Sequence, residues 1–600
     1  MYKYKNLLTQ WANYFIGVLM KFWDFIYRYF GDYADQVLRV SPGVAKQLRR
    51  SNIHLHVEVY ASLILFLLVL SAGIAAGVSV LVFFLGYPIF IPFFIALPVV
   101  VYLIMILIPS MVAGSRASAI DGEFPYTISY LSIMVMSGLS PYIAFERILK
   151  GSVIFQKTSE LAQRFVLLNK ILGKDPLTAF AMLSDRNPSS RVRETLSGYI
   201  STVKAGGDVI DYLNKRARAL FNDLLVSMKI IADRLGGLLE SYLAIVLLTM
   251  ISFTVLYFVT ASYSGVISFG IDTGTMSLLL YILMPFISIA IIYLGDVMQY
   301  KEAWMDWRPY YVFFGVTLPL AAFLSLLGIV LYGIPAFKTN PLVTAVHEFL
   351  ILPMKLADIP PNLAFVESSI ALSMALIVSI IPSLIYAEYI AREYTIINGI
   401  TRFIRDLVEV RKTGLPPEKS IIELSTRDYG VFSKYLKKIS LELTLGVPLR
   451  KIIEELFKKI KPWRAKVLLF ILTDSIEVGG GSVDVLENLA WFAESIEAIE
   501  AEKKRSMRTL MIVPYLGAVL TAFTIVFMAV YMGRIPLASG QFRAAASTVL
   551  PSIVLNTYLM GLVAGKVGSG SVAAGFKHAL ILTLVTMLFF TFAKLFTGFL

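Results

Sequence analysis

The chain alternates between long apolar runs and two long polar stretches. An α-helix needs about 20 mostly apolar residues to cross a bilayer, and nine runs of the sequence meet that requirement. The runs are residues 60–85, 89–112, 242–260, 276–294, 310–333, 364–386, 509–533, 547–566 and 579–599. The stretches 113–238 and 387–508 are too polar and too charged to cross. This pattern predicts an all-α, polytopic membrane protein with about nine transmembrane helices.

Both polar stretches are expected on one face of the membrane, because four spans separate them. Bases in short loops favour the cytoplasmic side. The short loops on the side of the polar stretches contain four of them: Lys301, Arg308, Lys566 and Lys577. The bases that fall elsewhere are Lys338, Lys355, Arg534 and Arg543 on the opposite side and Lys594 within a span. We therefore expect a multi-pass protein of the cell membrane whose N-terminus and polar domains are cytoplasmic.

The first segment, residues 1–56, is expected to be an amphipathic cytoplasmic region. Within it, residues 6–30 place apolar side chains at helical spacing with charged residues between them. Such a helix either lies on the inner membrane surface or packs against the protein's own cytoplasmic domain. The remaining segments are transmembrane helices 1–2 in 57–112, a first cytoplasmic helical domain in 113–238, transmembrane helices 3–6 in 239–386, a second cytoplasmic helical domain in 387–508 and transmembrane helices 7–9 in 509–600.

The two polar domains repeat the same phrases in the same order. SGLSPYIAFERIL (137–149) is paralleled by TGLPPEKSIIEL (413–424), and VKAGGDVIDYL (203–213) by EVGGGSVDVL (477–486). Chance matches would not keep their order at a nearly constant separation. The chain is therefore interpreted as a duplication, in which each unit has a pair of spans, a polar domain and further spans.

The repeated phrases are typical of turns between helices. Gly138 and Gly414 can take the left-handed conformation that ends a helix, and Pro141 and Pro417 suit the first turn of the next helix. A second glycine turn is expected in each domain: Gly206 and Gly207 in the first, Gly480 and Gly481 in the second. Each polar domain is therefore predicted to be a small helical bundle. Gly236-Gly237 is also interpreted as a helix-breaking turn.

The last helix of each bundle is expected to continue into the membrane. No proline interrupts the chain between Gly207 and Pro285 or between Gly481 and Pro514. Apolar residues continue at helical spacing beyond the second glycine turn: Leu486, Leu489, Ala493 and Ile496. A continuous helix is stiff and can carry movement from a polar domain into the bilayer.

Composition excludes several classes of protein. With 57% hydrophobic and 16% charged residues and a mean hydropathy of +0.73, the chain is far more apolar than soluble proteins, which have about 25% charged residues. The net charge of +13 is interpreted as membrane orientation, so no nucleic acid is expected as a partner. The chain has no cysteine, which rules out disulfides, thiolate metal sites and a cysteine nucleophile.

No catalytic, cofactor or metal site is predicted. The sequence lacks G-x-x-x-x-G-K-[ST], so the chain is not expected to hydrolyse nucleotides itself. GIDTG (270–274) and YLGD (293–296) contain phrases used by aspartic proteases, but neither has the partner residues of such a site, and Asp296 is interpreted as an interfacial charge. His54 and His56 have no acidic company for a metal.

Two glycine motifs in the spans permit close helix contact. GIAAG (73–77) and GLVAG (561–565) place Gly73 and Gly77, and Gly561 and Gly565, at the spacing of packed membrane helices. Packing within the chain is favoured over dimerisation, although a homodimer stays open.

The basic run KKIKPWRAK (458–466) is a candidate interaction surface. Its bases surround Trp463 and are Lys458, Lys459, Lys461, Arg464 and Lys466. One interpretation is a face exposed to solvent or lipid headgroups. The other is a docking surface for an acidic partner.

The paired S/T-G-L-x-P phrases and the glycine-led hairpins resemble those of the F-domain family of type II secretion. Its members are the inner-membrane platform proteins of type IV pili, type II secretion systems and the archaeal flagellum. The resemblance covers about 120–260 and 400–530, and the nine spans are similar to those of archaeal members. Bacterial members often have Gly-Glu before a further Gly, whereas this chain has Lys204-Ala205-Gly206 and Glu477-Val478-Gly479, so no role is transferred to that Glu.

The resemblance implies two six-helix cytoplasmic bundles and no active site or cofactor. It implies that a separate hexameric secretion-type ATPase binds the bundles and that pilin subunits in the membrane are lifted into a filament. The alternative is a secondary transporter with large cytoplasmic domains, which the scarcity of ionisable residues within the spans disfavours. The sequence does not distinguish between an adhesive pilus, a DNA-exchange pilus, an archaeal flagellum and a secretion system.

Overall fold

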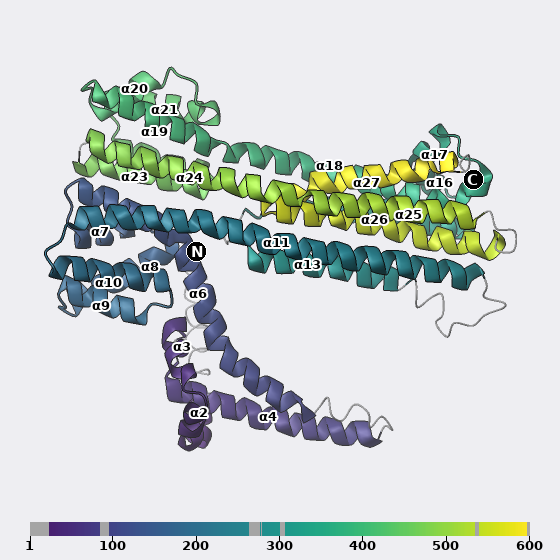
Figure 1. The fold of residues 1–600 in the computed structure, drawn as a ribbon, viewed down its shortest axis with the longest axis horizontal. Coiled ribbons are helices and arrows are strands. Elements are labelled where there is room, and N and C mark those ends of the chain that lie inside the picture. The colour runs from purple at the N-terminus through teal and green to yellow at the C-terminus, as the bar shows by residue number, and fades with distance from the viewer. Residues whose placement is uncertain are drawn as a thin grey trace, which may run out of the picture. The chain divides into compact units, whose positions relative to one another are not determined.

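The computed structural model describes residues 23–53, 55–84, 95–262, 277, 279–299, 306–479, 481–533 and 539–596, and every element in these residues is helical (Figure 1). The chain divides into two compact units. The first comprises Met1–Val135 and Leu139–Ala217, and the second comprises Met136–Gly138 and Arg218–Leu600. Most of the predicted amphipathic helix, residues 6–22, lies outside the described residues.

Nine helices within the described ranges are long and apolar enough to cross a membrane. They are Val57–Val80, Leu97–Met136, Val209–Thr260, Leu279–Met298, Arg308–Leu331, Leu363–Lys412, Val483–Met532, Phe542–Ser569 and Val572–Thr591. Each contains or overlaps one of the nine predicted runs. The prediction of an all-α, polytopic membrane protein is therefore confirmed.

The first unit is a membrane hairpin joined to a polar bundle. Its elements are η1 (Gly31–Tyr33), α2 (Ala34–Val40), α3 (Gly43–Ser51), α4 (Val57–Phe84), α6 (Leu97–Met136), α7 (Pro141–Arg147), η3 (Ile148–Gly151), α8 (Gln156–Val166), η4 (Leu167–Ile171), α9 (Pro176–Arg186), α10 (Ser190–Lys204) and the start of α11 (Val209–Ser262). The end of α6, the four helices α7 to α10 and the start of α11 form six helices around one core.

Aromatic rings in stacked and edge-to-face contact lie in the core of this first bundle. The ring of Phe165 lies 4.4 Å from that of Phe180 and 5.5 Å from that of Phe145, and Phe180 contacts Tyr199 at 5.4 Å between ring centroids. The buried carboxylate of Glu123 on α6 accepts hydrogen bonds from the backbone N–H groups of Lys157 and Thr158, at 2.8 and 2.9 Å. These bonds satisfy the free N–H groups at the start of α8 and fix α8 on α6.

The second unit has the same plan with more membrane helices. After α11 come η5 (Leu279–Leu283), α13 (Met284–Met298), α14 (Arg308–Val312), η6 (Phe313–Thr317), α15 (Leu318–Ser325), η7 (Leu326–Leu331), η8 (Pro335–Phe337), α16 (Pro341–Leu350), α17 (Leu352–Leu356), η9 (Pro361–Val366) and α18 (Glu367–Tyr394). The second bundle consists of α19 (Ile396–Lys412), α20 (Pro417–Leu424), α21 (Ser433–Thr444), α22 (Leu449–Lys459), α23 (Trp463–Gly479) and α24 (Val483–Leu510), with the short turn η10 (Gly430–Phe432). The last membrane helices are α25 (Ile512–Met532), α26 (Ser539–Ser569), η12 (Val572–Ala574), α27 (Gly575–Thr591) and α28 (Ala593–Phe596).

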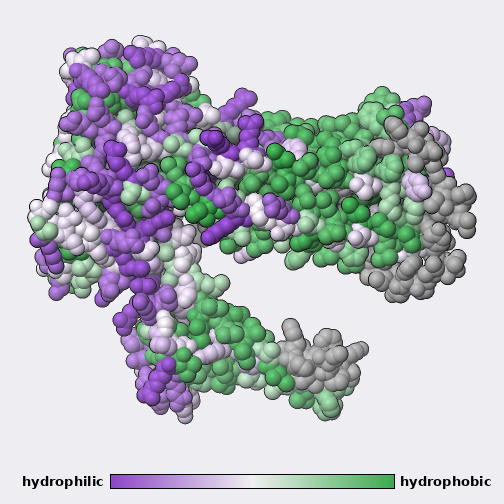
Figure 2. Space-filling view, in the orientation of Figure 1, coloured by the Kyte–Doolittle hydropathy of each residue, from purple (hydrophilic) through white to green (hydrophobic). Residues whose placement is uncertain are grey.

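The two bundles correspond helix by helix. The helices α20 to α23 repeat the order and approximate lengths of α7 to α10, while α19 and α24 occupy the places of the longer helices α6 and α11. The first and the last break of each bundle fall at the repeated turn phrases. Figure 2 shows hydrophobic surface where α11, α13, α25 and α26 run together and hydrophilic surface where α19 to α24 extend beyond them. The expectation of two duplicated helical bundles is confirmed.

Both the first and the last helix of each bundle continue into a span, whereas only the last was predicted to do so. The helix α6 runs unbroken from Leu97 to Met136 despite Pro109 and Pro125, and α18 is separated from α19 only by Thr395. At the other end α11 is one helix of 54 residues, about 80 Å long. Its counterpart α24 is separated from α25 only by Met511.

The expected turn at Gly236-Gly237 is wrong, because both glycines lie inside α11. A Cβ at Gly236 would lie 3.3 Å from the Leu510 side chain, which is tighter than ordinary van der Waals contact. A small residue at this position therefore lets α11 approach the end of α24 closely.

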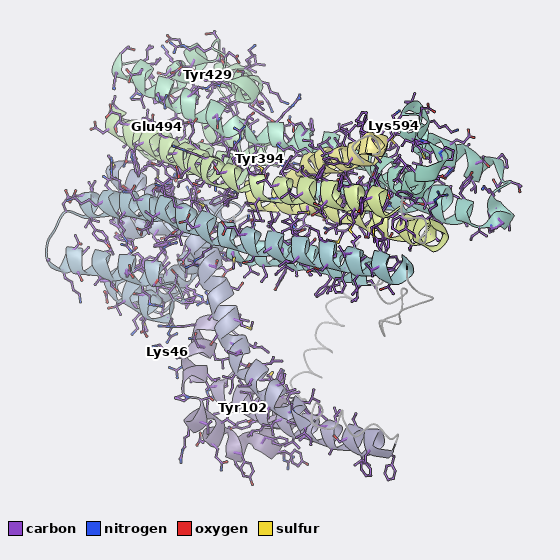
Figure 3. The ribbon with its side chains drawn as sticks, turned by 45° about the vertical axis from the view of Figure 1, so that its right-hand side comes forward. Lys46, Tyr102, Tyr394, Tyr429, Glu494 and Lys594 are labelled. Carbon is purple, nitrogen blue, oxygen red and sulfur yellow. The ribbon has the colours of Figure 1, made fainter. Side chains whose placement is uncertain are left out.

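A partly buried ion pair joins α22 to α23 in the second bundle. The guanidinium of Arg450 contacts the carboxylates of Asp474, which is fully buried, and of Glu477. Elsewhere in the bundle, the hydroxyl of Tyr429 donates to Asp406 at 2.8 Å, and burial together with this bond raises the pKa of Tyr429. Figure 3 marks Tyr429 and, on α24, Glu494, which pairs with Arg405 of α19 at 2.8 Å.

Arg450→Met is expected to destabilise this bundle by about 3–5 kcal/mol, because it removes the cation and leaves the Asp474 carboxylate buried. The melting temperature of the full chain in detergent should fall by about 10 °C, read by intrinsic tryptophan fluorescence. Lys451→Met, at an exposed neighbour on the same helix, should change it by about a degree or two. Equal melting temperatures for the two variants would contradict a structural role for the pair.

Candidate functional site

The repeated turn residues occupy equivalent places in the two bundles. Gly138 and Gly414 have φ values of 99° and 90°, in the left-handed region that glycine tolerates best. Pro141 is the first residue of α7 and Pro417 the first residue of α20, where the missing N–H of proline leaves no helical bond unmade.

The second pair of glycine turns is similar but not identical in the two bundles. Gly206 has a φ of 68° and Gly481 a φ of 61°. Gly207 has no positive φ, but a Cβ there would lie 3.1 Å from the Thr202 side chain. Gly480 lies outside the described residues.

One arginine ties the two turns of the second bundle together. Arg411, near the end of α19, donates from Nε and Nη2 to the carbonyl oxygen of Gly481 at 3.1 and 3.0 Å and from Nη1 to that of Leu415. The α19–α20 turn and the α23–α24 turn therefore form one end of the bundle. From this end α24 leads back for 28 residues, about 42 Å, to the start of α25.

The basic run lies at the opposite end of α23, nearer the membrane. Lys458 and Lys459 end α22, Lys461 lies in the link to α23, and all three are exposed. None of the three forms an ion pair with any residue that the structure describes. They form a positive surface, here called the lysine surface, that is open to a partner.

The other two bases of the run have different surroundings. Arg464 is only 5% exposed and pairs with Glu500 of α24, so its charge is satisfied inside the bundle. Lys466 is partly buried, and burial lowers the pKa of its ammonium group, with a further contribution from the charge of Lys461. The five bases are neighbours in the sequence and were therefore predicted to form one surface. In the structure only three of them are exposed.

The repeat-related helices α11 and α24 lie side by side and parallel within the second unit. The guanidinium of Arg218 lies 4.5 Å from the centre of the Trp491 ring, and the rings of Phe221 and Phe492 are 5.4 Å apart. Farther along, Gly236 meets Leu510.

The contact between these helices continues into the membrane along α25. A Cβ at Gly517 would lie 3.2 Å from the Leu243 side chain, so α11 and α25 also approach closely. The pairs Arg218–Trp491, Gly236–Leu510 and Leu243–Gly517 join residues separated by nearly the same number of positions as the two repeats. Equivalent parts of the two sequence repeats therefore pack in register. Sequence reasoning anticipated each long helix but not their pairing.

The two glycine motifs of the spans have opposite surroundings. A Cβ at Gly561 would overlap the backbone of Ala579, and one at Gly565 would overlap the backbone of Gly575, so this face of α26 packs directly on α27. A Cβ at Gly73 or Gly77 of α4 would meet no atom of the described chain within 4 Å.

The described residues contain no group of three or more His, Cys, Asp or Glu side chains that could hold a metal ion. Asp296 forms an ion pair with Lys566 Nζ at 2.5 Å, between α13 and α26. The Asp-Thr-Gly phrase at 272–274 and His54 lie outside the described ranges.

These features define a class of protein: a polytopic membrane protein with two repeated helical bundles whose last helices pair and continue into the bilayer. Residues 127–257 and 403–530 match the family described as type II secretion system (T2SS), protein F. Each of the two bundles therefore matches the F domain of this family, and this supports, at a coarse level, a membrane platform protein of the secretion and pilus type.

An uncharacterized protein of Methanocaldococcus jannaschii is 22% identical to the chain over 515 residues, which cover 81% of this chain and 82% of that protein. No solved structure matches the chain.

Proposed function

We propose that this chain is the platform of a machine that assembles a type IV pilus-like or archaeal flagellum-like filament, or of a type II secretion-like system. In this function it couples a cytoplasmic hexameric ATPase to the insertion of pilin subunits into the filament. The observation that carries the proposal is the in-register pair formed by α11 and α24–α25, which leads from the polar bundles into the membrane. Both bundles then lie on the cytoplasmic side, where ATP is available.

The paired helices suit the transmission of movement. An α-helix is stiff along its axis, and α11 is continuous over about 80 Å. A change in position of either bundle, imposed by a motor that hydrolyses ATP, moves the membrane end of its own helix. Because the two helices pack in register, a displacement of one relative to the other is felt along the whole pair.

The lysine surface is the proposed contact with the ATPase. Its three ammonium groups, on Lys458, Lys459 and Lys461, are exposed and form no ion pair with a carboxylate of the described residues. An acidic patch on the motor would complement them and increase the rate of association, with a strong dependence on salt.

The open glycine face of α4 is the proposed contact with pilin subunits. Pilins are held in the bilayer by one apolar helix, and small residues allow two helices to approach closely in lipid. Gly73 and Gly77 offer such a surface without a neighbour from the described chain. Gly561 and Gly565 are already occupied by α27.

The test is charge reversal on the lysine surface. The triple variant Lys458→Glu, Lys459→Glu, Lys461→Glu should reduce recovery of a secretion-type ATPase from the same cell by at least about tenfold in co-purification at 150 mM salt, because three attractive contacts become repulsive. The readout is the ratio of ATPase to platform after purification in nanodiscs.

The matched control reverses three other exposed lysines of the same bundle: Lys419, Lys434 and Lys437. ATPase recovery with the control variant should equal that of the unaltered chain. Recovery that is normal for the first variant and lost for the control would move the contact to another face. If neither variant changes recovery in any salt concentration, the ATPase does not dock through these charges.

A further inference from the structure

A cavity of about 1050 Å³ in the first unit has a strongly basic wall. It lies between α3, the polar part of α6 and the helices α8 and α9. Figure 3 labels Lys46, which lies on α3 and lines this cavity. Six of the lining side chains are cations: Lys46, Arg49, Arg50, Arg116, Arg164 and Arg186. Asp185 is the one carboxylate among the described residues that line the cavity.

The six cations outnumber the carboxylates that line the cavity. None of them forms an ion pair within the described part of the chain. Two of them bind the end of α3 instead: Arg116 Nη1 donates to the Arg50 carbonyl oxygen at 3.1 Å, and Arg164 Nη2 donates to Asn52 Oδ1 at 2.5 Å. Like charges gathered around one cavity repel each other, so an anion in the cavity would stabilise the arrangement.

Two buried donors at the cavity wall have no partner. Asn187 is 3% exposed, and its Oδ1 accepts from the backbone N–H of Ser189 at 2.9 Å, but its Nδ2 has no partner among the described residues. The Nε of Arg116 is likewise buried without a partner. Buried donors are nearly always hydrogen-bonded in folded proteins. Both unpaired groups are donors, so the missing ligand is an acceptor.

The cavity lies close to the ends of two membrane helices. Its wall includes the end of α3, and Ser51 is only six residues before Val57, where α4 begins. It also includes Arg116, which follows the apolar part of α6 by about one turn. Bases at such positions lie at the level of the lipid headgroups.

We propose that this cavity binds the headgroup of an anionic phospholipid. The arginines and Lys46 pair with the phosphate oxygens, with Arg able to donate two parallel bonds to one phosphate, and Asn187 Nδ2 donates to a further oxygen. The wall also has apolar side chains, among them Leu161, Leu168 and Met182, that suit the glycerol and first methylenes of a lipid. A free phosphate would use only the charged side of so large a cavity. This site does not depend on the proposed platform function.

The test measures lipid binding to the purified full chain in neutral detergent. Dioctanoyl phosphatidylglycerol and dioctanoyl phosphatidylcholine are titrated separately, and bound lipid is counted by native mass spectrometry. The double variant Arg49→Gln, Arg186→Gln should weaken binding of the anionic lipid about thirty-fold, since each base near an anionic lipid contributes a factor of about five. Neither side chain makes a hydrogen bond within the described residues, so the fold is left intact.

The controls separate charge from structure. Lys174→Gln, Lys204→Gln removes two exposed bases of the same bundle that do not line the cavity, and its lipid affinity should equal that of the unaltered chain. Arg49→Lys, Arg186→Lys keeps the charges and should recover most of the affinity. Asn187→Leu removes one donor without changing charge and should weaken binding of the anionic lipid several-fold.

Four outcomes would overturn the proposal. The first is undiminished phosphatidylglycerol binding by the Gln double variant. The second is equal binding of phosphatidylcholine. The third is pyrophosphate that binds more tightly than the lipid and displaces it, which would assign the cavity to a soluble anion. The fourth is polyglutamate that does the same, which would assign it to an acidic protein segment. Should the double variant not accumulate, Arg49→Gln alone carries the same test, with a loss of about fivefold.

Discussion

Gly565→Leu is expected to prevent correct assembly of the last membrane helices. A Cβ at this position would already overlap the Cα and the backbone nitrogen of Gly575, the first residue of α27. The position of Cβ is fixed by the backbone of α26 and the atoms that it meets are backbone atoms of α27, so no side-chain rotation can relieve the overlap, and α26 must separate from α27. Overpacking a core usually costs about 1–3 kcal/mol, and the cost here should exceed that range. We expect little folded protein, read as the monodisperse peak after detergent extraction.

Gly73→Leu is the matched control, because it changes the same residue type in the other G-x-x-x-G motif. No described atom lies within 4 Å of a Cβ at Gly73, and leucine favours a helix by about 0.8–1.0 kcal/mol over glycine. This variant should accumulate and melt like the unaltered chain. Equal accumulation of the Gly565 and Gly73 variants would show that α26 and α27 do not pack as described.

The same control probes the proposed pilin contact. If the open face of α4 receives the apolar helix of a pilin, Gly73→Leu should give a well-folded platform that assembles few filaments. The glycine motifs illustrate a limit of sequence analysis, because both have the same letters and spacing. Only the positions of α27 and α4 in the structure distinguish an occupied face from an open one.

The architecture was largely predictable, because its signals are local. Apolar runs long enough to span a bilayer and repeated turn phrases need no knowledge of distant residues, and they gave the nine spans and the two bundles. The turn at Gly138 needs a left-handed residue whatever surrounds it. Such features follow from the chain alone.

The errors arose where the deciding partner is far away in sequence. Gly236-Gly237 lies inside α11, and Gly236 packs closely against Leu510, 274 positions later in the sequence. Arg464 belongs to the basic run in sequence but not to the exposed basic surface, because it is buried and pairs with Glu500 on the next helix. The basic cavity was not anticipated at all, because its cations come from four separate helices between Lys46 and Arg186.

Asp233→Pro is expected to abolish filament assembly without unfolding the protein. Asp233 lies on the exposed side of α11, between the first bundle and the apolar part of the helix. Proline there removes one backbone hydrogen bond and its ring clashes with the preceding turn, which kinks a helix at a cost of about 3 kcal/mol. The kink would disturb the register of α11 with α24 near Gly236 and Leu510. Filament yield, measured as sheared pilin per cell, should fall at least about tenfold.

Asp233→Ala removes the same carboxylate while keeping the helix and should assemble filaments normally. The decisive comparison includes ATPase binding, because the proline variant should still co-purify with the motor. Loss of filaments with retained ATPase binding separates transmission from docking, which the charge-reversal variants address at the lysine surface. If the proline variant accumulates, binds the ATPase and produces normal filaments, movement does not pass along α11. The pairing of the two repeat-related helices would then stabilise the membrane region without relaying force.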